Sequence, residues 1–264
     1  MLARTHWSTY LAAAMAGTLL AGAASAASPG MTAGTTEGVH PAGSAPVTVI
    51  ELFTSQGCSS CPTADALLKT FSKRPDIVAL TFPVDYWDYL GWKDTLASPK
   101  FSARQRAYAK ARGDGRVYTP QVVVNGLKHA LGSSAGDIDK AIAVTTPKVE
   151  PSRVGVRVRS AEEHLIINLE AAREPARANE ATIWLALVQR QIDVKIKRGE
   201  NHGKIGIYHN VVREWMPVGV WNGTAATIKI AHHAVKQSGA DGCAIILQHG
   251  DAGAIVGAAF LDKW

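Results

Sequence analysis

The sequence predicts an α/β domain over residues 47–148, followed by a sandwich-like domain of antiparallel strands over residues 149–264. In the first part, apolar runs alternate with residues at helical spacing, which is typical of α/β folds. In the second part, about seven short β-prone runs are separated by polar or glycine-containing turns, as in antiparallel β-sandwiches. The chain of 264 residues is long enough for two cores of ordinary size.

The first 26 residues have the pattern of a secretory signal peptide. Arg4 and His6 form a short positive region, the stretch 11–24 is almost wholly small and apolar, and Ala24-Ser25-Ala26 supplies an A-x-A cleavage site. The apolar stretch is shorter than the roughly 20 residues that a membrane span needs. We therefore expect a periplasmic or secreted protein without a stable membrane anchor after cleavage. A form anchored by an uncleaved signal is the alternative.

Residues 27–46 are rich in Gly, Ser, Thr, Ala and Pro and lack a hydrophobic period, so we expect a flexible leader. The formal net charge is +6, and the basic residues are scattered rather than gathered in a stripe with interleaved aromatics. This distribution, together with the export signal, argues against a nucleic-acid partner.

The elements of the first domain are bounded by proline, glycine or polar turns. They are expected as a strand at 47–53, a helix at 64–71, a strand at 77–84, a helix at 101–112, strands at 121–124 and 128–131, and a helix at 137–144 that stops before Pro147. A crossover helix makes the first two strands parallel, and the Asn125-Gly126 turn makes the last two antiparallel. This is the element order of the thioredoxin fold. The strands of the second domain are expected at 154–158, 165–169, 183–188, 204–212, 226–230, 243–248 and 255–260.

Cys58 and Cys61 lie where the first strand meets the first helix. Two thiols at this spacing can close a disulfide, and the free N–H groups at a helix start stabilise a thiolate. Cys58 is expected to be exposed and to act as the nucleophile, and Cys61 to resolve the mixed disulfide. A permanently closed, inert disulfide and half of a zinc site are the alternatives.

Thr119-Pro120 precedes the third strand. In a thioredoxin-like domain the proline at this place is cis and lies opposite the two cysteines, and the backbone of the residue before it pairs with the substrate chain. We therefore expect a cis bond here and a substrate-binding role for Thr119. An ordinary proline that opens a strand is the alternative.

Glu51 is the one acidic residue in the apolar run of the first strand. A buried carboxylate there is expected to accept the proton of Cys61 during resolution. The alternative is an exposed or salt-bridged acid at an edge.

The loop after the second strand, residues 85–94, is dense in aromatic and acidic side chains, and it leaves the sheet at the edge that carries the cysteines. It is expected to bind the substrate through Asp85, Tyr86, Trp87, Asp88 and Trp92. Trp87 and Trp92 as buried anchors are the alternative. Helix residues Arg104, Gln105 and Tyr108 are expected to hydrogen-bond the loop acids.

Three features of the second domain are open to a functional interpretation. Cys243 lies in an apolar strand and is expected to be a buried, inert thiol. His232-His233 is a weak metal motif, because neighbouring residues of a strand point to opposite faces. Residues 197–203 form a polar, glycine-containing turn that serves either function or local hydrogen bonding.

Six stretches match one protein family: ELFTSQGCSSCP (51–62), VDYWDYLGWKD (84–94), RQRAY (104–108), YTPQ (118–121), GEN (199–201) and NVVR (210–213). The chain resembles the secreted, mostly bacterial, thioredoxin-like family catalogued as domain of unknown function 1223. The resemblance implies a thioredoxin fold with a β-rich continuation and no established reaction. Unlike thioredoxin itself, the chain has Ser59-Ser60 between the cysteines and no Trp before Cys58, which leaves the direction of the redox reaction open.

These features favour an exported thiol-disulfide oxidoreductase that acts on a protein or small-molecule thiol or disulfide and needs no cofactor. One alternative is a copper-binding or metal-delivery protein that holds Cu(I) by the same two thiolates. Another is a non-catalytic binding module whose disulfide is structural.

Overall fold

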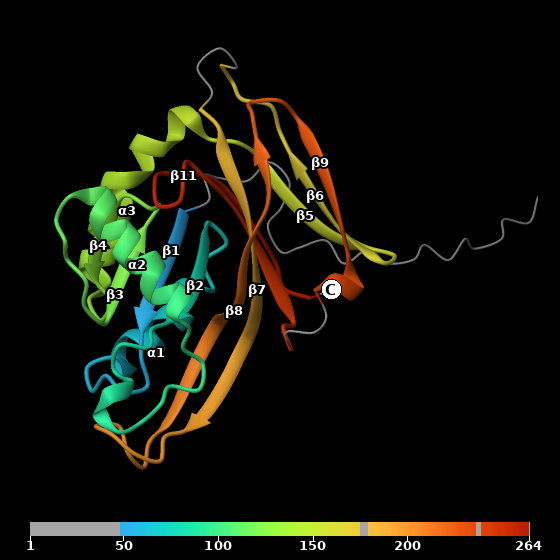
Figure 1. Ribbon diagram of the computed structural model, residues 1–264. Helices are drawn as coiled ribbons and strands as arrows, with labels where there is room; N and C mark the ends of the chain where they lie inside the picture. Colours follow the sequence, from blue (N-terminus) through green and yellow to red (C-terminus); the bar gives the residue numbers. More distant parts are fainter. Residues whose placement is uncertain (1–47, 175–178, 236–238, 264) are drawn as a thin grey trace, which may run out of the picture. The chain divides into compact units, whose positions relative to one another are not determined.

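A computed structural model describes residues 48–174, 179–235 and 239–263, all of which belong to one compact unit (Figure 1). The expected signal (1–26) and leader (27–46) lie outside these described residues. No helix in the described ranges is long and apolar enough to cross a membrane.

The first part of the chain has the expected order of elements. They are β1 (Thr48–Thr54), α1 (Pro62–Phe71), β2 (Ile77–Pro83), the short 3-10 helix η1 (Asp88–Leu90), α2 (Pro99–Arg112), β3 (Gln121–Val124), β4 (Lys128–Leu131) and α3 (Ala135–Val149). The expected pairings are confirmed, because β1 runs parallel to β2 and β3 runs antiparallel to β4.

Helix α3 is longer than the sequence indicated, because it runs through Pro147 instead of stopping before it. Val149 beyond the proline is 1% exposed, so packing of the last turn holds the helical backbone. The proline removes one backbone donor. The Glu150 N–H still bonds to the Thr146 carbonyl, which closes the helix end.

All seven strands expected in the second part are present. They are β5 (Val156–Ala161), β6 (His164–Leu169), β7 (Ala181–Lys195), β8 (Ile205–Trp221), β9 (Ala226–Ala231), β10 (Gly242–Gln248) and β11 (Ile255–Leu261). Strands β7 and β8 extend far beyond the expected 183–188 and 204–212. Together they form a long hairpin that reaches the loop after β2 (Figure 1).

The strands of the second part are divided between two sheets, and the larger of these sheets continues into the strands of the first part. The larger sheet has eight strands in the order β11-β10-β7-β8-β2-β1-β3-β4 and is mostly antiparallel. The smaller sheet has the order β5-β6-β9 and packs through one apolar cluster on β7, β10 and β11. The boundary expected near residue 148 therefore divides a part with helices from an all-strand part within one compact unit.

The two parts of the large sheet meet where β2 lies parallel to β8, with Thr81 opposite Val211. The hydroxyl of Thr81 donates to the carbonyl of His209 at 2.7 Å, and the Asn210 side-chain amide donates to the carbonyl of Ala79 at 2.9 Å. Asn210 has a φ of 47°, a left-handed conformation that asparagine tolerates better than most residues.

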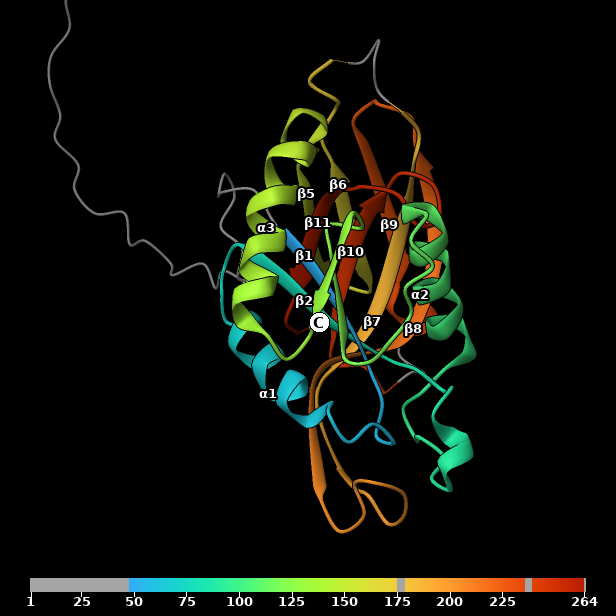
Figure 2. The same cartoon turned by 90° about the vertical axis from the view of Figure 1, so that its left-hand side faces the viewer.

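The helices cover both faces of the sheet around β1 (Figure 2). Because side chains alternate along a strand, Ile50 and Leu52 pack in one cluster with α1 and α3, whereas Val49 and Phe53 pack in another with α2. Glu51 is two residues from Val49 and two from Phe53, so its side chain points to the same face of the sheet as theirs. This is the face that α2 covers, whereas α1 covers the opposite face.

Candidate functional site

Cys58 and Cys61 form a disulfide between the end of β1 and the start of α1, with their Cα atoms 5.4 Å apart. Cys61 is the N-cap residue of α1, and its carbonyl accepts hydrogen bonds from the N–H groups of Ala64 and Asp65. The pair therefore occupies the first turn of the helix, as the spacing of the cysteines indicated.

The expected exposure of Cys58 is wrong, because Cys58 is only 2% exposed and Cys61 is fully buried. Between them, Ser59 and Ser60 are exposed. The Ser60 hydroxyl lies 3.4 Å from Sγ of Cys58, where it can donate to a thiolate. A partner therefore meets the serines first and reaches the sulfur atoms only if the surrounding loops give way.

The tip of the β7–β8 hairpin, residues 196–204, is one of these surrounding segments. The side-chain amide of Asn201 donates to the carbonyls of Gln56 and Cys58 at 3.0 and 2.8 Å. The backbone N–H of Ser59 donates to the Glu200 carboxylate at 3.2 Å. The polar turn noted in the sequence at 197–203 thus binds the backbone of the segment that carries the cysteines.

The loop after β2 holds this cysteine-bearing segment from another side. The backbone N–H of Gln56 donates to the Asp94 carboxylate, and the indole N–H of Trp92 donates to the Gln56 side-chain oxygen, both at 2.8 Å. Asp88 in turn accepts from the N–H of Asp94 at 3.0 Å. Trp92 and Asp88 therefore act as anchors within the protein, which was the alternative to a direct substrate contact for Trp92.

Trp87 connects the cysteine-bearing segment with Thr119. The indole N–H of Trp87 donates to the hydroxyl of Thr119 at 2.7 Å. Trp87 also lies close to Gly57, because a Cβ atom added at Gly57 would be only 3.1 Å from the Cβ atom of Trp87. The Thr119-Pro120 bond is cis, as expected. Tyr89 is 77% exposed and stacks on Trp87 with 6.5 Å between the ring centroids. This exposed ring was not among the expected substrate-binding residues.

Asp85 and Tyr86 are partly buried at the start of the same loop. The Asp85 carboxylate binds the hydroxyl of Ser102 on α2. Burial raises the pKa of Tyr86 to about 12, so its hydroxyl stays protonated at neutral pH. Of the helix residues expected to bond the loop acids, Arg104 and Tyr108 bind Glu51 instead, and Gln105 binds the carbonyl of Tyr118.

Glu51 is fully buried, but its carboxylate is bound to α2 rather than directed at the cysteines. It accepts from Nε of Arg104 at 2.8 Å and from the hydroxyl of Tyr108. Arg104 also binds the side chain of Gln248 in β10 at 3.0 Å. The expected role as proton acceptor for Cys61 is corrected to a buried ion pair, because Glu51 points to the opposite face from α1.

Asp65 is the acidic residue that the sequence analysis missed. It follows Cys61 by four residues on α1, so both side chains lie on one face of the helix. Asp65 is 6% exposed, and its carboxyl accepts from the hydroxyl of Thr54 at 2.8 Å. Burial raises its pKa from 3.8 to about 8. The helical spacing of Cys61, Ala64, Asp65 and Leu68 was the signal that could have identified it.

The other residues noted in the sequence are not part of this site. Cys243 is a free thiol that is fully buried in β10, and burial raises its pKa. His232 lies in a short 3-10 turn rather than in a strand, and its Nε2 is 3.2 Å from the hydroxyl of Ser160. Over the described ranges, no group of three or more His, Cys, Asp or Glu residues is arranged to hold a metal ion.

Comparisons with known proteins give a family and related folds. A family model described as "Protein of unknown function (DUF1223)" matches residues 49–248. The crystal structure of a structural-genomics target from Agrobacterium tumefaciens is 35% identical, with a TM-score of 0.73 over 83% of this chain and 95% of that one. HBP35 of Porphyromonas gingivalis shares 12% identity and a TM-score of 0.57 over 83% of this chain and 75% of that one, so it shows the fold alone. No curated protein matches.

Proposed function

The chain belongs to DUF1223, a family of proteins of unknown function, and we propose that it is an exported thiol-disulfide oxidoreductase whose N-terminal part is thioredoxin-like. The Cys58–Cys61 disulfide at the first turn of α1 is the observation on which the proposal rests. The partial positive charge at a helix start stabilises the thiolate that forms when such a disulfide opens. The element order and the Thr119-Pro120 bond also support the proposal.

The exchange moves two electrons between a pair of partner thiols and the Cys58–Cys61 disulfide, so that one pair is oxidised as the other is reduced. A partner thiolate attacks Sγ of Cys58, the Cys58–Cys61 bond breaks, and Cys61 leaves as a thiolate. A second partner thiolate then attacks the mixed disulfide, so that the partner is oxidised and both cysteines are reduced. In the opposite direction, the Cys58 thiolate attacks a partner disulfide and Cys61 resolves the mixed disulfide.

Asp65 supplies the proton for the buried cysteine in this scheme. With a pKa of about 8, its carboxyl is mostly protonated at neutral pH and can give a proton to the Cys61 thiolate as that thiolate leaves. A buried thiolate without a positive partner is costly, so this proton transfer stabilises the reduced form.

The exposed ring of Tyr89, stacked on Trp87 beside Thr119, is the surface that we assign to the partner. Aromatic side chains provide a large contact area at a low cost in conformational entropy. A partner that lies along Trp87 and Thr119 would have its sulfur atoms near the exposed Ser59 and Ser60.

A structural disulfide in a non-catalytic binding module is the second candidate. The burial of both cysteines favours this alternative, as do the hydrogen bonds that Asn201 donates to their segment and that Glu200 accepts from it. In that case the disulfide would fix the segment against the hairpin and take no part in exchange.

Exchange kinetics distinguish the two candidates. The parent, Cys58→Ser and Cys243→Ser proteins are mixed with a reduced peptide dithiol, and peptide oxidation is followed by mass spectrometry. We expect oxidation by the parent and by Cys243→Ser but none by Cys58→Ser. Equal rates for the parent and Cys58→Ser would refute the oxidoreductase. A parent without exchange activity would favour the structural disulfide, or Cu(I) binding if the reduced protein takes up copper through both thiols.

A further inference from the structure

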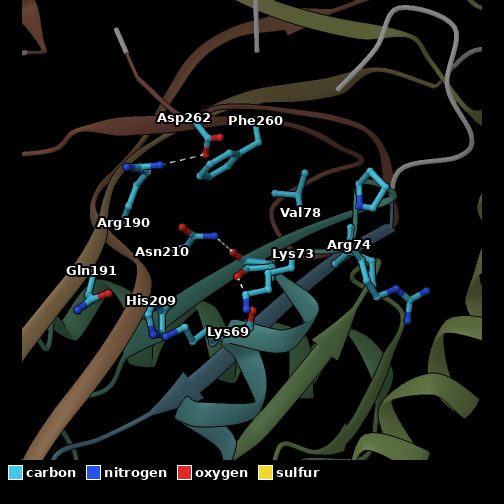
Figure 3. A pocket seen from close by; sticks show the side chains of 14 residues that line it. Lys69, Lys73, Arg74, Val78, Arg190, Gln191, His209, Asn210, Phe260 and Asp262 are labelled. Atoms are coloured by element: carbon cyan, nitrogen blue, oxygen red, sulfur yellow. Dashed lines mark hydrogen bonds and ion pairs between the residues drawn. The ribbon is translucent and has the colours of Figure 1, made fainter. Parts of the chain in front are cut away.

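A basic pocket of about 380 Å³ lies between the C-terminal end of α1, the start of β2 and strands β7, β8 and β11 (Figure 3). Its volume is in the range of about 300–1,000 Å³ that is typical of small-molecule sites. Its polar lining includes Lys69, Lys73, Arg74, Arg190, His209 and Asn210.

Two of the four cationic side chains already have acidic partners. Arg74 pairs with Asp76 and Asp139 at 3.1 and 3.2 Å. Arg190 lies 3.6 Å from Asp262, the carboxylate that lines the pocket, and 3.9 Å from Asp241. The charge of these two arginines is therefore largely compensated within the protein.

Lys69 and Lys73 are both exposed and form no ion pair with a described residue. Lys69 is in the last turn of α1, Lys73 follows the end of that helix, and both line the pocket (Figure 3). Two like charges that line one pocket repel each other, and a bound anion would offset the repulsion. The pocket thus has two ammonium groups that form no ion pair within the described part of the chain.

His209 and Asn210 form the opposite side of the pocket. His209 on β8 is 9% exposed, and burial together with the charges of Lys69 and Lys73 lowers its pKa, although Asp193 on β7 and a hydrogen bond to the backbone of Arg190 act in the opposite sense. The hydrogen bond to Arg190 orients the imidazole ring. The neighbouring Asn210 is fixed by its hydrogen bond to Ala79, so this side of the pocket is held in place before any ligand arrives.

Apolar groups complete the pocket. Ile77, Val78 and Ala79 of β2 are almost fully buried beneath it, and the ring of Phe260 on β11 is partly exposed at its side. A ligand for this pocket therefore needs an apolar body as well as an anionic group.

We propose that the pocket binds a small phosphate monoester whose dianionic group lies between Lys69 and Lys73 and whose apolar body packs against Phe260. A phosphate monoester carries close to two negative charges at pH 7 and three strong acceptor oxygens, which match the two ammonium groups that line the pocket. A monocarboxylate supplies only half of this charge. The site is independent of the redox chemistry, because neither cysteine takes part in it.

Titration of the oxidised full-length protein with phenyl phosphate tests the proposal, with calorimetry for affinity and NMR for location. We expect 1:1 binding that shifts the His209 ring and Asn210 side-chain amide resonances, and weaker binding of benzoate and of inorganic phosphate. The Lys69→Gln/Lys73→Gln variant should raise Kd for phenyl phosphate about tenfold, or about 1.4 kcal/mol. The matched variant Lys140→Gln/Lys148→Gln, which removes two exposed lysines of α3, should change Kd less than about twofold.

Three results would overturn the proposal. The first is binding of phenyl phosphate that does not saturate, or that shifts the NMR resonances of residues far from His209. The second is an equal loss of affinity in both lysine variants, which would indicate a non-specific effect of net charge. The third is benzoate that binds as tightly as phenyl phosphate, which would exclude recognition of a dianion. Unchanged far-UV circular dichroism of the variants shows that folding is intact, because all four lysines are exposed.

Discussion

The carboxyl group of Asp65 accepts a hydrogen bond from the hydroxyl of Thr54 at 2.8 Å, one helical turn after Cys61. This side-chain pair joins α1 to the end of β1, the two elements between which the disulfide lies in the chain. Burial raises the pKa of Asp65 to about 8, with the hydrogen bond from Thr54 and the charge of Asp94 as smaller influences. The carboxyl of Asp65 is therefore mostly protonated at neutral pH, one helical turn along α1 from Cys61.

The Asp65→Asn variant should remove part of the pH dependence of stability. In the folded protein the pKa of Asp65 is about 8, against 3.8 for the ordinary side chain. The folded state therefore binds this proton more tightly, and the free energy of unfolding falls as pH rises from 3.8 to about 8. Urea unfolding at pH 5 and pH 8 should show a smaller fall for Asp65→Asn than for the parent. The exposed-site control Asp139→Asn should behave like the parent, and an unchanged fall in Asp65→Asn would contradict the assignment.

The Asn201→Ala variant should make the disulfide easier to reach. Asn201 is 1% exposed and donates both of its amide protons to the cysteine-bearing segment, so its truncation leaves two carbonyls without these partners. We expect a loss of about 1–3 kcal/mol in the free energy of unfolding and faster reduction of the disulfide by dithiothreitol. The matched control is Asn222→Ala in the exposed turn after β8. Reduction no faster than in the parent would show that the hairpin does not limit access.

The Glu51→Gln variant should destabilise the fold without affecting exchange. Removing the charge of Glu51 leaves Arg104 buried without its carboxylate, which typically costs about 3–5 kcal/mol. The rate of peptide oxidation by the folded fraction should stay within about twofold of the parent, because Glu51 and α1 lie on opposite faces of the sheet. The exposed control Glu163→Gln should leave both quantities unchanged. A large loss of exchange in fully folded Glu51→Gln would restore its expected role as proton acceptor.

The Tyr89→Ala variant should weaken binding of a peptide partner. Because Tyr89 is 77% exposed, its removal should change the free energy of unfolding by less than about 0.5 kcal/mol. The KM for a dithiol peptide should rise several-fold, while the kcat stays close to that of the parent, since Tyr89 takes no part in the proposed exchange between sulfur atoms. Val144→Ala, at an exposed apolar position on α3, serves as the control. An unchanged KM would remove Tyr89 from the partner surface.

The order of elements was predictable from the sequence because the first three strands, β1, β2 and β3, are compact apolar runs. The runs around Ile50 and Leu80 are buried on both faces, and the Asn125-Gly126 turn fixes the pairing of β3 with β4. The extent of β7 and β8 was not predictable, since their outer halves mix polar and apolar residues and gain their order from pairing with each other. Their joining to β2 depends on long-range bonds from Asn210 and Thr81 that no local pattern contains.

The candidate site was predictable only in part. Cys58, Cys61 and the cis bond before Pro120 follow from local spacing and the order of elements. The partner of Glu51 could not be inferred, because the parity of one strand residue decides which sheet face it occupies. Burial of Cys58 was missed for a related reason: the covering residue Asn201 lies 143 positions away in the chain.

The reduction potential of the Cys58–Cys61 pair distinguishes a disulfide that exchanges with partners from a structural one. It can be measured by equilibrating the Cys243→Ser protein with glutathione or dithiothreitol redox buffers and counting free thiols by alkylation and mass spectrometry. Related redox-active dithiols have potentials of about −270 to −120 mV, and we expect the Cys58–Cys61 pair to have a potential in this range. A potential below about −300 mV would contradict this expectation, because a disulfide that resists reduction so strongly is structural.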